Sequence, residues 1–452
     1  MNNTIHIINL GCPKNLIDGE VMAAALIDAG FELVSSPEDA EIIIINTCTF
    51  ILPAREESID EIFRAARLKT ERRCRFLVVA GCLPQRYGTE LEEEIPEVDL
   101  FLGTGEVPRI AAHIGTLRNA REPKQRSCIG RPDFLMNSSH RRFIATPPHT
   151  AYLKIAEGCS NNCSYCVIPA VRGTFRSRQM DDVLREAAIL AQQGVKEVIL
   201  TAQETTRYGK DLGISSGLPA LLKEMVLIEG IEWIRLLYTY PAHLDAELFR
   251  TIRDLDTVCN YIDIPVQHID DGILRSMNRK GGGLIREMIG NARAIIPGVA
   301  LRTSLIVGFP GETRAIFERL LAFVREARFD HVGVFEYSKE EGTAAAHLPG
   351  HLPKRVKQRR RNIIMEAQAS ISRRINESLI DTVTKIIIEE PSDVEGYDYI
   401  GRSERQAPDI DGVTYVKAPG RAIGDMVTGT IASADEYDLF AEEIIPPGQT
   451  LP

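Results

Sequence analysis

Short apolar runs alternate with amphipathic stretches over the first 120 residues of the chain. The amphipathic stretches 18–30 and 53–68 have helical periodicity; the first ends at a glycine and the second begins at a proline. The apolar runs are rich in β-branched residues, which is typical of buried parallel strands: 5–10, 41–46 and 76–81. The alternation predicts an open parallel α/β sheet domain over residues 1–120.

A second β/α series follows a polar segment without clear periodicity, which we interpret as a linker over residues 121–148. The series spans 149–352, and its helical stretches include 181–194 and 313–327. Its strand-like runs are 151–156, 197–202, 233–238, 261–266, 302–309 and 331–337. Six β/α units predict a partial (β/α)6 barrel.

The remaining residues change twice in character. Residues 353–380 have the pattern of one long basic helix, whereas residues 381–448 contain five strand-like pieces separated by Gly, Asp and Pro. Short strands of this kind predict a small closed five-stranded β-barrel of OB-like size. The expected fold class is therefore α/β with a β-barrel at the carboxyl end.

Composition places the chain among ordinary globular proteins, with 44% hydrophobic and 26% charged residues. The start lacks the basic and apolar regions of a signal peptide, and no apolar run reaches the roughly 18 residues of a membrane helix. Nine cysteines without a secretory signal favour a reducing compartment, where thiols bind metals or react. We therefore expect a cytoplasmic protein with no membrane contact.

The net charge of −10 is concentrated at one end of the chain. Residues 381–452 contain 15 Asp and Glu but 5 Lys and Arg, whereas the two signs balance elsewhere. Nucleic-acid binding needs basic residues that neutralise phosphates, so a domain this acidic would repel RNA. It would attract a basic protein through complementary charge. The charge pattern therefore predicts a basic protein partner for the terminal barrel and no stable nucleic-acid binding.

Each predicted strand of the first domain is followed closely by a cysteine. These three residues, Cys12, Cys48 and Cys82, form the N-terminal cysteine set. The carboxyl ends of parallel strands lie along one edge of a sheet, so these thiols are expected to converge. A glycine precedes the first and the third, which would let the backbone approach a bulky inorganic group. Three buried structural cysteines are the alternative, because free cysteine is often a small core residue.

A second set, called the core cysteine set below, follows the first predicted barrel strand, where Cys159, Cys163 and Cys166 form a C-x3-C-x2-C motif. It lies on the carboxyl side of the strand, where barrel enzymes carry their active sites. Structural zinc usually takes four protein ligands, so a zinc site is the weaker alternative. Thiolates also hold iron–sulfur clusters, and three thiolates on a 4Fe-4S cluster leave one iron open.

The C-x3-C-x2-C motif, with Tyr165 before its last cysteine on the first turn of a β/α barrel, resembles the radical S-adenosylmethionine superfamily. The resemblance implies that S-adenosylmethionine binds the open iron of the cluster. The methylthiotransferases of this superfamily are similar to the chain over 11–20, 46–60 and 81–87 in their first domain, and over 151–178, 202–209, 263–268 and 305–313 in their radical core. The terminal barrel resembles their TRAM domain, so the resemblance covers nearly the whole chain.

The motifs GCPKN (11–15) and AQETTRYG (202–209) resemble the branch of this family that modifies ribosomal protein uS12. The branch that modifies transfer RNA usually has the sequence GCQMN at the position of the first motif. Two residues depart from the family pattern: Gly19 stands where serine is usual, and Glu204 where aspartate is usual. A transfer RNA methylthiotransferase is the alternative function, and a non-catalytic iron–sulfur or zinc protein is a further one.

The resemblance implies that the enzyme inserts a methylthio group at the β-carbon of an aspartate of uS12. It implies two 4Fe-4S clusters: one on the core cysteine set, which cleaves S-adenosylmethionine to a 5′-deoxyadenosyl radical, and one on the N-terminal set, which presents sulfur. A second S-adenosylmethionine would provide the methyl group. General acid–base catalysis contributes only about 10²–10⁴-fold, so activating such a C–H bond requires a radical cofactor. A low-potential electron donor such as a flavodoxin or ferredoxin is implied as a partner.

Two groups of residues at the barrel mouth are further candidates for binding S-adenosylmethionine. Gln203, Glu204 and Thr205 end the second barrel strand and are placed to reach the methionine end of the cofactor, or else form a satisfied turn. Gln267 and His268 end the fourth strand and would face the same mouth, although a lone histidine is more often a core residue.

A glycine-bearing turn after the fifth barrel strand is the last candidate. Gly308, Pro310 and Gly311 would let the backbone approach the adenosine moiety; a simple tight turn is the alternative. The remaining cysteines lie outside both sets: we expect Cys74 and Cys259 to be packing residues and Cys128 to lie in the linker. The basic run 354–361 is expected to be a solvated helix face that suits an acidic electron donor.

Overall fold

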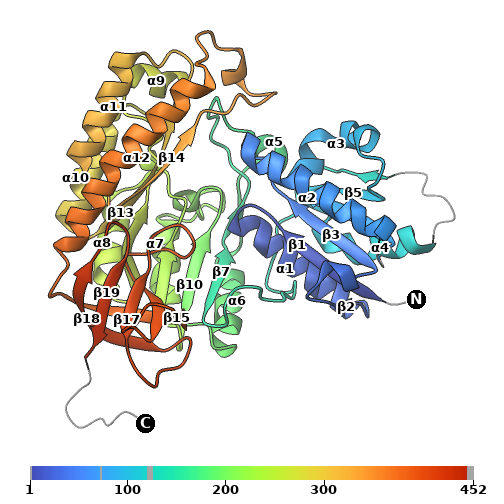
Figure 1. Ribbon diagram of the computed structural model, residues 1–452, viewed down its shortest axis with the longest axis horizontal. Coiled ribbons are helices and arrows are strands. Elements are labelled where there is room, and N and C mark those ends of the chain that lie inside the picture. Colours follow the sequence, from blue (N-terminus) through green and yellow to red (C-terminus); the bar gives the residue numbers. More distant parts are fainter. Residues whose placement is uncertain (1–2, 72–73, 120–125, 445–452) are drawn as a thin grey trace.

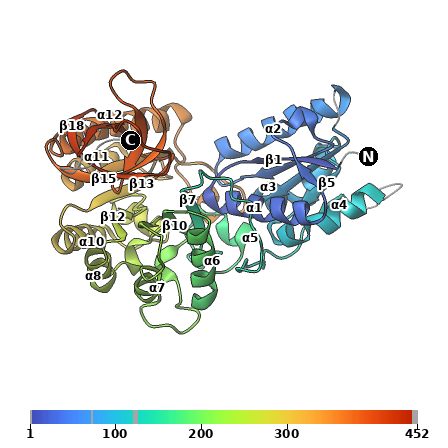
Figure 2. The same ribbon diagram turned by 90° about the horizontal axis from the view of Figure 1, so that it is seen from below.

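A computed structural model describes residues 3–71, 74–119 and 126–444 of the chain. The chain forms three domains, and the central domain contacts both of the others (Figure 1). The N-terminal sheet domain and the terminal barrel lie at different places around the central domain (Figure 2), and both contribute residues to the face of its sheet that is turned away from its helices. Residues 121–125 of the predicted linker and 445–448 of the predicted barrel domain lie outside the described residues.

The N-terminal domain is a parallel six-stranded sheet in the order β2-β1-β3-β4-β5-β6. Its strands are β1 (Thr4–Asn9), β2 (Glu32–Leu33), β3 (Ile42–Thr47), β4 (Phe76–Gly81), β5 (Leu100–Leu102) and β6 (Ser127–Cys128). Its helices are α1 (Pro13–Asp28), α2 (Leu52–Glu71), α3 (Cys82–Glu94) and α4 (Ile110–Asn119). The predicted parallel α/β sheet is confirmed.

Two details of this domain differ from the sequence-based expectation. Helix α1 begins at Pro13 rather than at residue 18, because proline fits the first helical turn and Cys12 occupies the cap position. The segment predicted as linker contributes β6, and Cys128 therefore lies on an edge strand paired with β5. Cys74 is buried in the hydrophobic core of this domain, as expected for a packing residue.

The central domain is a parallel six-stranded sheet in the order β14-β13-β12-β11-β10-β7, the predicted partial barrel. Its strands are β7 (Thr150–Lys154), β10 (Glu197–Thr201), β11 (Trp233–Leu236), β12 (Val258–Asp263), β13 (Ala300–Val307) and β14 (His331–Glu336). Its helices are α5 (Ile168–Arg172), α6 (Met180–Gln192), α7 (Gly217–Met225), α8 (Ala246–Asp254), α9 (Asp271–Ser276), α10 (Gly282–Ile295) and α11 (Arg314–Ala327). The short strands β8 (Ala156–Glu157) and β9 (Arg176–Ser177) form a separate pair.

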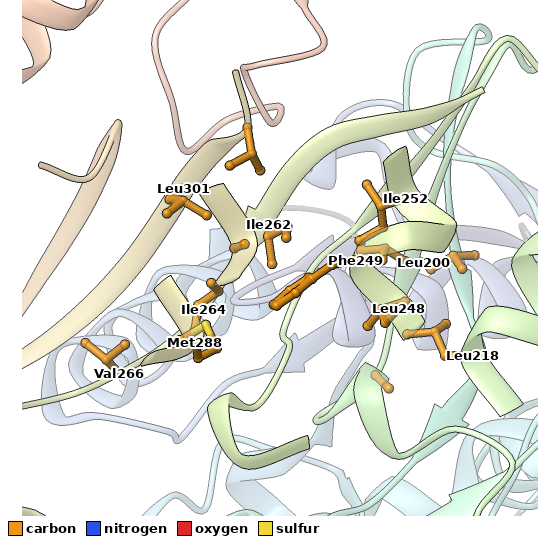
Figure 3. Close-up of a cluster of buried hydrophobic side chains, with 14 of the residues drawn as sticks. Leu200, Leu218, Leu248, Phe249, Ile252, Ile262, Ile264, Val266, Met288 and Leu301 are labelled. Carbon is orange, nitrogen blue, oxygen red and sulfur yellow. The ribbon is translucent and has the colours of Figure 1, made fainter. Parts of the chain in front are cut away.

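The main hydrophobic core lies between the sheet of the central domain and its helices. Alternate strand residues such as Leu200 and Leu301 pack against Phe249 of α8 and Met288 of α10, and all four are buried (Figure 3). Side chains on the opposite face of the sheet form a second cluster, which also includes residues of α1 and of the terminal barrel. Cys259 belongs to this second cluster and is buried, as expected for a packing residue.

The terminal domain is a closed barrel in the order β15-β16-β17-β19-β18, which confirms the predicted architecture. Its strands are β15 (Val383–Pro391), β16 (Tyr399–Ser403), β17 (Thr414–Lys417), β18 (Met426–Ala434) and β19 (Leu439–Glu443). The long helix α12 (Lys354–Glu377) connects it to the central domain. The basic run 354–361 is only partly a solvated face, because Arg360 is buried and donates to Glu312 at 2.6 Å.

Buried ion pairs join the terminal barrel to the central sheet. Glu197 of β10 accepts from the guanidinium groups of Arg402 in β16 and Arg235 in β11. Burial opposes the charged form of Glu197, but Arg402 and Arg235 hold its pKa at about 2. These pairs and the shared apolar cluster make the barrel part of one packed unit with the sheet. In the part of the chain that the structure describes, no helix is long and apolar enough to cross a membrane.

Candidate active site between two cysteine sets

The structure brings the N-terminal cysteine set together at the carboxyl edge of the first sheet. Cys12 caps α1, Cys48 follows β3 and Cys82 opens α3. Burial raises the pKa of Cys48 to about 12, and the nearby Cys12 and Cys82 add to the rise. The three thiols therefore lie within electrostatic range of one another, as the strand periodicity predicts.

Glycines keep the backbone close around this set. Gly11 has φ +90°, and a Cβ there would lie 2.6 Å from Cβ and 2.9 Å from Sγ of Cys48. Gly19, the departure from the family pattern, faces Asn9: a Cβ at position 19 would lie 1.8 Å from its Oδ1. A serine at position 19 would therefore displace the Asn9 side chain, so the departure has a local cause.

The core cysteine set lies on the loop between β8 and α5. Burial raises the pKa of Cys159 to about 11 and that of Cys166 to about 12, and neighbouring thiols of the set contribute to both shifts. Nη1 of Arg279 lies 3.7 Å from Sγ of Cys163 and 3.5 Å from the hydroxyl of Tyr165. The guanidinium of Arg279 therefore adds a positive charge beside the core set, and for Cys166 it opposes part of the rise in pKa.

A buried chain of charged groups connects the two cysteine sets. Arg172 of α5 donates to Sγ of Cys82 at 3.3 Å and to Asp18 of α1 at 2.5 Å. Lys154 donates to the same Asp18 at 2.5 Å and to Glu157 at 2.8 Å. Burial opposes ionisation of Glu157, but Lys154 and Arg172 hold its pKa at about 2. Glu157 lies two residues before the core set. This series of buried charged side chains therefore extends from one cysteine set to the other.

Two tyrosines lie along the same gap between the sets. The pKa of Tyr238 is raised by burial and then by the nearby Cys12. Tyr240 lies within electrostatic range of Cys163 and Arg279, and burial raises its pKa as well. Tyr238 has φ +60°, a left-handed backbone conformation that is uncommon for a bulky residue and frequent at functional sites.

The candidates after β10 act on the core cysteine loop and its neighbours. Gln203 donates to Glu157, and its own Oε1 is buried without a partner among the described residues. Oε2 of Glu204 accepts from Nδ2 of Asn161, inside the C-x3-C-x2-C motif, at 2.5 Å. Thr205 donates to the carbonyl of Leu237 at 2.8 Å, so it supports the turn. The side chain of Glu204 therefore positions the loop that carries the core set.

The remaining candidates lie further along the mouth and have structural partners. Gln267 has φ +68° and pairs through its backbone with β13. His268 is fully buried; its Nδ1 accepts from the amide of Asp270 at 3.0 Å, and its Nε2 lies 3.7 Å from Glu312. Its contacts are those of a core residue.

In the glycine-bearing turn after β13, a Cβ on Gly308 would lie 2.4 Å from Cγ of Lys357 on α12. Packing against that helix is therefore sufficient to require glycine at this position. Pro310 is buried, whereas Gly311 has φ +83° and nothing within 4 Å of the place of a Cβ. Of the three positions, Gly311 alone leaves open space for a ligand to approach the backbone.

The donor atoms at the two sets suit iron–sulfur clusters. Each set offers three thiols, and in the described ranges no three His, Cys, Asp or Glu side chains converge closely enough to hold a single metal ion. A zinc ion takes thiolates at about 2.3 Å, so its ligands lie close together, whereas a multi-iron cluster spreads them over several irons. The amide oxygen of Gln203, beside the core set, is buried and accepts no hydrogen bond from the described residues.

Sequence reasoning missed the residues that connect the sets. Asp18, Glu157 and Arg172 carry no motif of their own, although Glu157 immediately precedes Gly158 and the core set. Tyr238 and Arg279 were also missed, because only the fold places them beside cysteines that are distant in the sequence. The position of Glu157 next to the motif was the one usable signal.

Comparison with protein families assigns all three domains. Residues 4–103 match the family described as Uncharacterized protein family UPF0004, residues 153–324 match the Radical SAM superfamily, and residues 380–444 match the TRAM domain. Among solved structures, the radical S-adenosylmethionine methyltransferase TsrM from Kitasatospora setae with cobalamin and a 4Fe-4S cluster is similar, with a TM-score of 0.54. It is 18% identical over 74% of this chain and 75% of that chain, which shows a common fold.

Curated relatives match along almost the whole length. The ribosomal protein uS12 methylthiotransferase RimO of Syntrophus aciditrophicus is 56% identical over 98% of this chain and 99% of its own. The protein of the same name from Geotalea uraniireducens is 50% identical over 98% of both chains. With the three matching domains and the two cysteine sets, these relatives place the chain in the family of ribosomal protein uS12 methylthiotransferases, and it is a radical S-adenosylmethionine enzyme of the methylthiotransferase class.

Proposed function

We propose that this enzyme attaches a methylthio group to the β-carbon of an aspartate of ribosomal protein uS12. In this proposal it uses two 4Fe-4S clusters, one on each cysteine set, and two molecules of S-adenosylmethionine. The observation that carries the proposal is the pair of three-thiol sets on either side of Tyr238 and Tyr240. When bound, the cofactors supply hydrogen-atom abstraction, the sulfur and the methyl group.

The chain's own residues contribute positioning and exclusion of water. Cys12, Cys48 and Cys82 would hold one cluster, and the core set would hold the other. Glu204 fixes the core loop through Asn161, and Gln203 presents its amide beside the cofactor of the open iron. The series of buried side-chain contacts that links Cys82 to Glu157 sets the distance between the two cysteine sets, because each charged residue in it is held by at least two partners.

Mass spectrometry of uS12 tests this function. Co-expression of the enzyme with uS12 in a strain without its own methylthiotransferase should add one methylthio group, located on an aspartate by fragmentation. Transfer RNA from the same cells is analysed in parallel. Unmodified uS12 together with methylthiolated transfer RNA would establish the alternative substrate, and no modification of either would contradict a methylthiotransferase.

We further propose that uS12 docks on the outer face of the terminal barrel. Tyr397, Tyr415 and Phe440 pack together there on half-exposed positions. The rings of Tyr415 and Phe440 stack with their centroids 5.1 Å apart. Exposed carboxylates lie next to them in the sequence or on the same strand face: Asp393, Glu395 and Glu442. An apolar centre rimmed by negative charge suits a basic protein and repels RNA.

Neutralising the rim of this face is expected to slow association with uS12. The variant Asp393→Asn, Glu395→Gln, Glu442→Gln should lower the association rate about tenfold at low salt and lose most of its salt dependence, since rim charges act on encounter. Surface plasmon resonance over a salt series measures both. Glu90→Gln, Glu93→Gln, Glu94→Gln at the exposed end of α3 is the matched control. Equal rates for the two variants would exclude this face, and capture of transfer RNA instead of uS12 would reverse the choice of partner.

Electron supply and location complete the proposal. Exposed arginines on α12 offer a positive surface for an acidic low-potential donor of the flavodoxin or ferredoxin class: Arg355, Arg359 and Arg361. We propose a cytoplasmic location, because the substrate is a ribosomal protein and the thiols must stay reduced to bind iron.

A further inference from the structure

Residues 338–345 form a bridging segment that follows the carboxyl end of β14 and contacts both domains that carry cysteine sets. On the side of the central domain, the amide of Ala345 donates at 2.8 Å to the carbonyl of Ser164, which lies inside the C-x3-C-x2-C motif. Tyr165 of the same motif packs against the apolar cluster that includes Ala345. The loop that carries the core cysteine set is therefore in direct contact with the bridging segment.

The bridging segment reaches the N-terminal domain through Glu340. Its carboxylate is 2% exposed, and Oε2 accepts from Nη1 of Arg86 at 2.7 Å and from Nη1 of Arg55 at 3.2 Å. Among the described residues, Glu340 is the one carboxylate within ion-pair distance of either arginine. In the same segment, the hydroxyl oxygen of Ser338 accepts from the amide of Leu52 at 3.3 Å. Two helices of the N-terminal domain, α2 and α3, are thus held by this segment.

Arg86 extends this contact to the N-terminal cysteine set. It lies on α3, four residues after Cys82, which opens that helix. Its Nη1, the atom that contacts Glu340, also donates at 3.1 Å to the carbonyl of Thr49, the residue after Cys48. Thr49 is fully buried, and buried carbonyls are normally hydrogen-bonded, so the position of Arg86 fixes the backbone beside Cys48.

We propose that Glu340 is a positioning residue for the N-terminal cysteine set, and that the bridging segment fixes the Cys48 loop relative to the core cysteine loop. The carboxylate acts through Arg86, which holds the carbonyl beside Cys48, while the amide of Ala345 holds the core loop. A reaction that needs two centres is sensitive to displacements of about 1 Å between them. This inference rests on the proposed function in one respect, the assignment of a cluster to each cysteine set.

Thiol reactivity in the iron-free, full-length protein tests the contact without any cofactor. In Glu340→Gln, we expect Cys48 to react with iodoacetamide about tenfold faster, because one charged hydrogen bond that keeps this buried thiol covered is lost. Cys163, in the core set, should react at the wild-type rate, and peptide mass spectrometry measures both cysteines in one sample. Glu340→Asp keeps the charge on a shorter side chain and should restore part of the protection of Cys48.

Glu341→Gln is the matched control, because the side chain of Glu341 is exposed and its contact with Arg86 is made by the backbone carbonyl. This variant should keep the slow reaction of Cys48. An unchanged rate at Cys48 in Glu340→Gln would overturn the inference. An equal increase at Cys48 and Cys163 would overturn it too, because it would show a general loosening of the fold rather than an effect on one set.

Electron paramagnetic resonance of reconstituted protein gives a second readout. In a background where Cys159, Cys163 and Cys166 are changed to alanine, the signal of the reduced protein comes from the N-terminal set alone. Adding Glu340→Gln to this background should alter the g values, whereas adding Glu341→Gln should not; g values that both additions leave unchanged would contradict the inference. Failure of the proposed function is distinct: this background would then bind no iron, while thiol reactivity in the iron-free protein would still report on Glu340.

Discussion

Changing Cys159, Cys163 and Cys166 together to alanine is expected to abolish reductive cleavage of S-adenosylmethionine while one cluster remains. The three thiols are the only cysteines of the chain between Cys128 and Cys259, so no nearby cysteine in the sequence can replace them. Without thiolates the loop offers no soft ligands to iron. The N-terminal set is independent of this change, because its thiols come from the other domain.

Two measurements on the anaerobically reconstituted variant check this result. Iron and acid-labile sulfide should fall to about half of the wild-type content, as expected when one of two 4Fe-4S clusters is lost. With a chemical reductant, 5′-deoxyadenosine should fall below detection. Cys74→Ala, which changes a buried cysteine of the N-terminal core, is the control and should keep both. Continued 5′-deoxyadenosine production by the triple variant would refute the assignment of the radical site.

The sequence predicts the sheets of this enzyme well because their strands are locally apolar and regularly spaced. The convergence of Cys12, Cys48 and Cys82 follows from that spacing, since parallel strands end at one edge. Element boundaries that depend on helix capping or on an edge strand are less predictable. Helix α1 begins five residues before the predicted start at residue 18, and β6 joins the sheet from within the predicted linker. Both depend on tertiary neighbours that the local pattern does not contain.

The polar interior of the site could not be predicted from the sequence. Lys154 contacts Asp18 across 136 residues of sequence, and Arg172 reaches Asp18 across 154. No local periodicity marks such pairs, because each residue is polar in a position that only the domain arrangement buries. Gly308 shows the opposite case: its motif suggested a cofactor contact, whereas the side chain of Lys357 already explains the need for glycine.

Asp18 joins the N-terminal domain to the central domain through buried ion pairs, so its charge is expected to matter more than that of any surface carboxylate. Its two oxygens accept from Lys154 and Arg172, each at 2.5 Å, and all three side chains are at most 4% exposed. The change Asp18→Asn keeps the shape but removes the charge, which leaves two buried cations with Glu157 as their remaining shared counter-ion. Breaking a buried pair in this way costs about 3–5 kcal/mol.

The loss should appear first at the interface between the N-terminal and central domains. Hydrogen exchange of α1 (Pro13–Asp28) should quicken about a hundredfold or more in Asp18→Asn, the rate change that corresponds to about 3 kcal/mol of local stability. Asp28→Asn is the matched control on the same helix: it pairs with Arg141, but the two side chains are 45% and 71% exposed. An exposed pair contributes about 0–1 kcal/mol, so exchange should change less than tenfold.

Function should change in a characteristic way in the same variant. Each cysteine set keeps its own thiols, so iron content and cleavage of S-adenosylmethionine should remain, whereas methylthiolated uS12 should fall at least tenfold because a small displacement of the two sets weakens alignment of the reacting atoms. The ratio of 5′-deoxyadenosine to modified uS12 measures this uncoupling. A variant that keeps the wild-type ratio and the slow exchange of α1 would show that the Asp18 contacts do not set the geometry between the two cysteine sets.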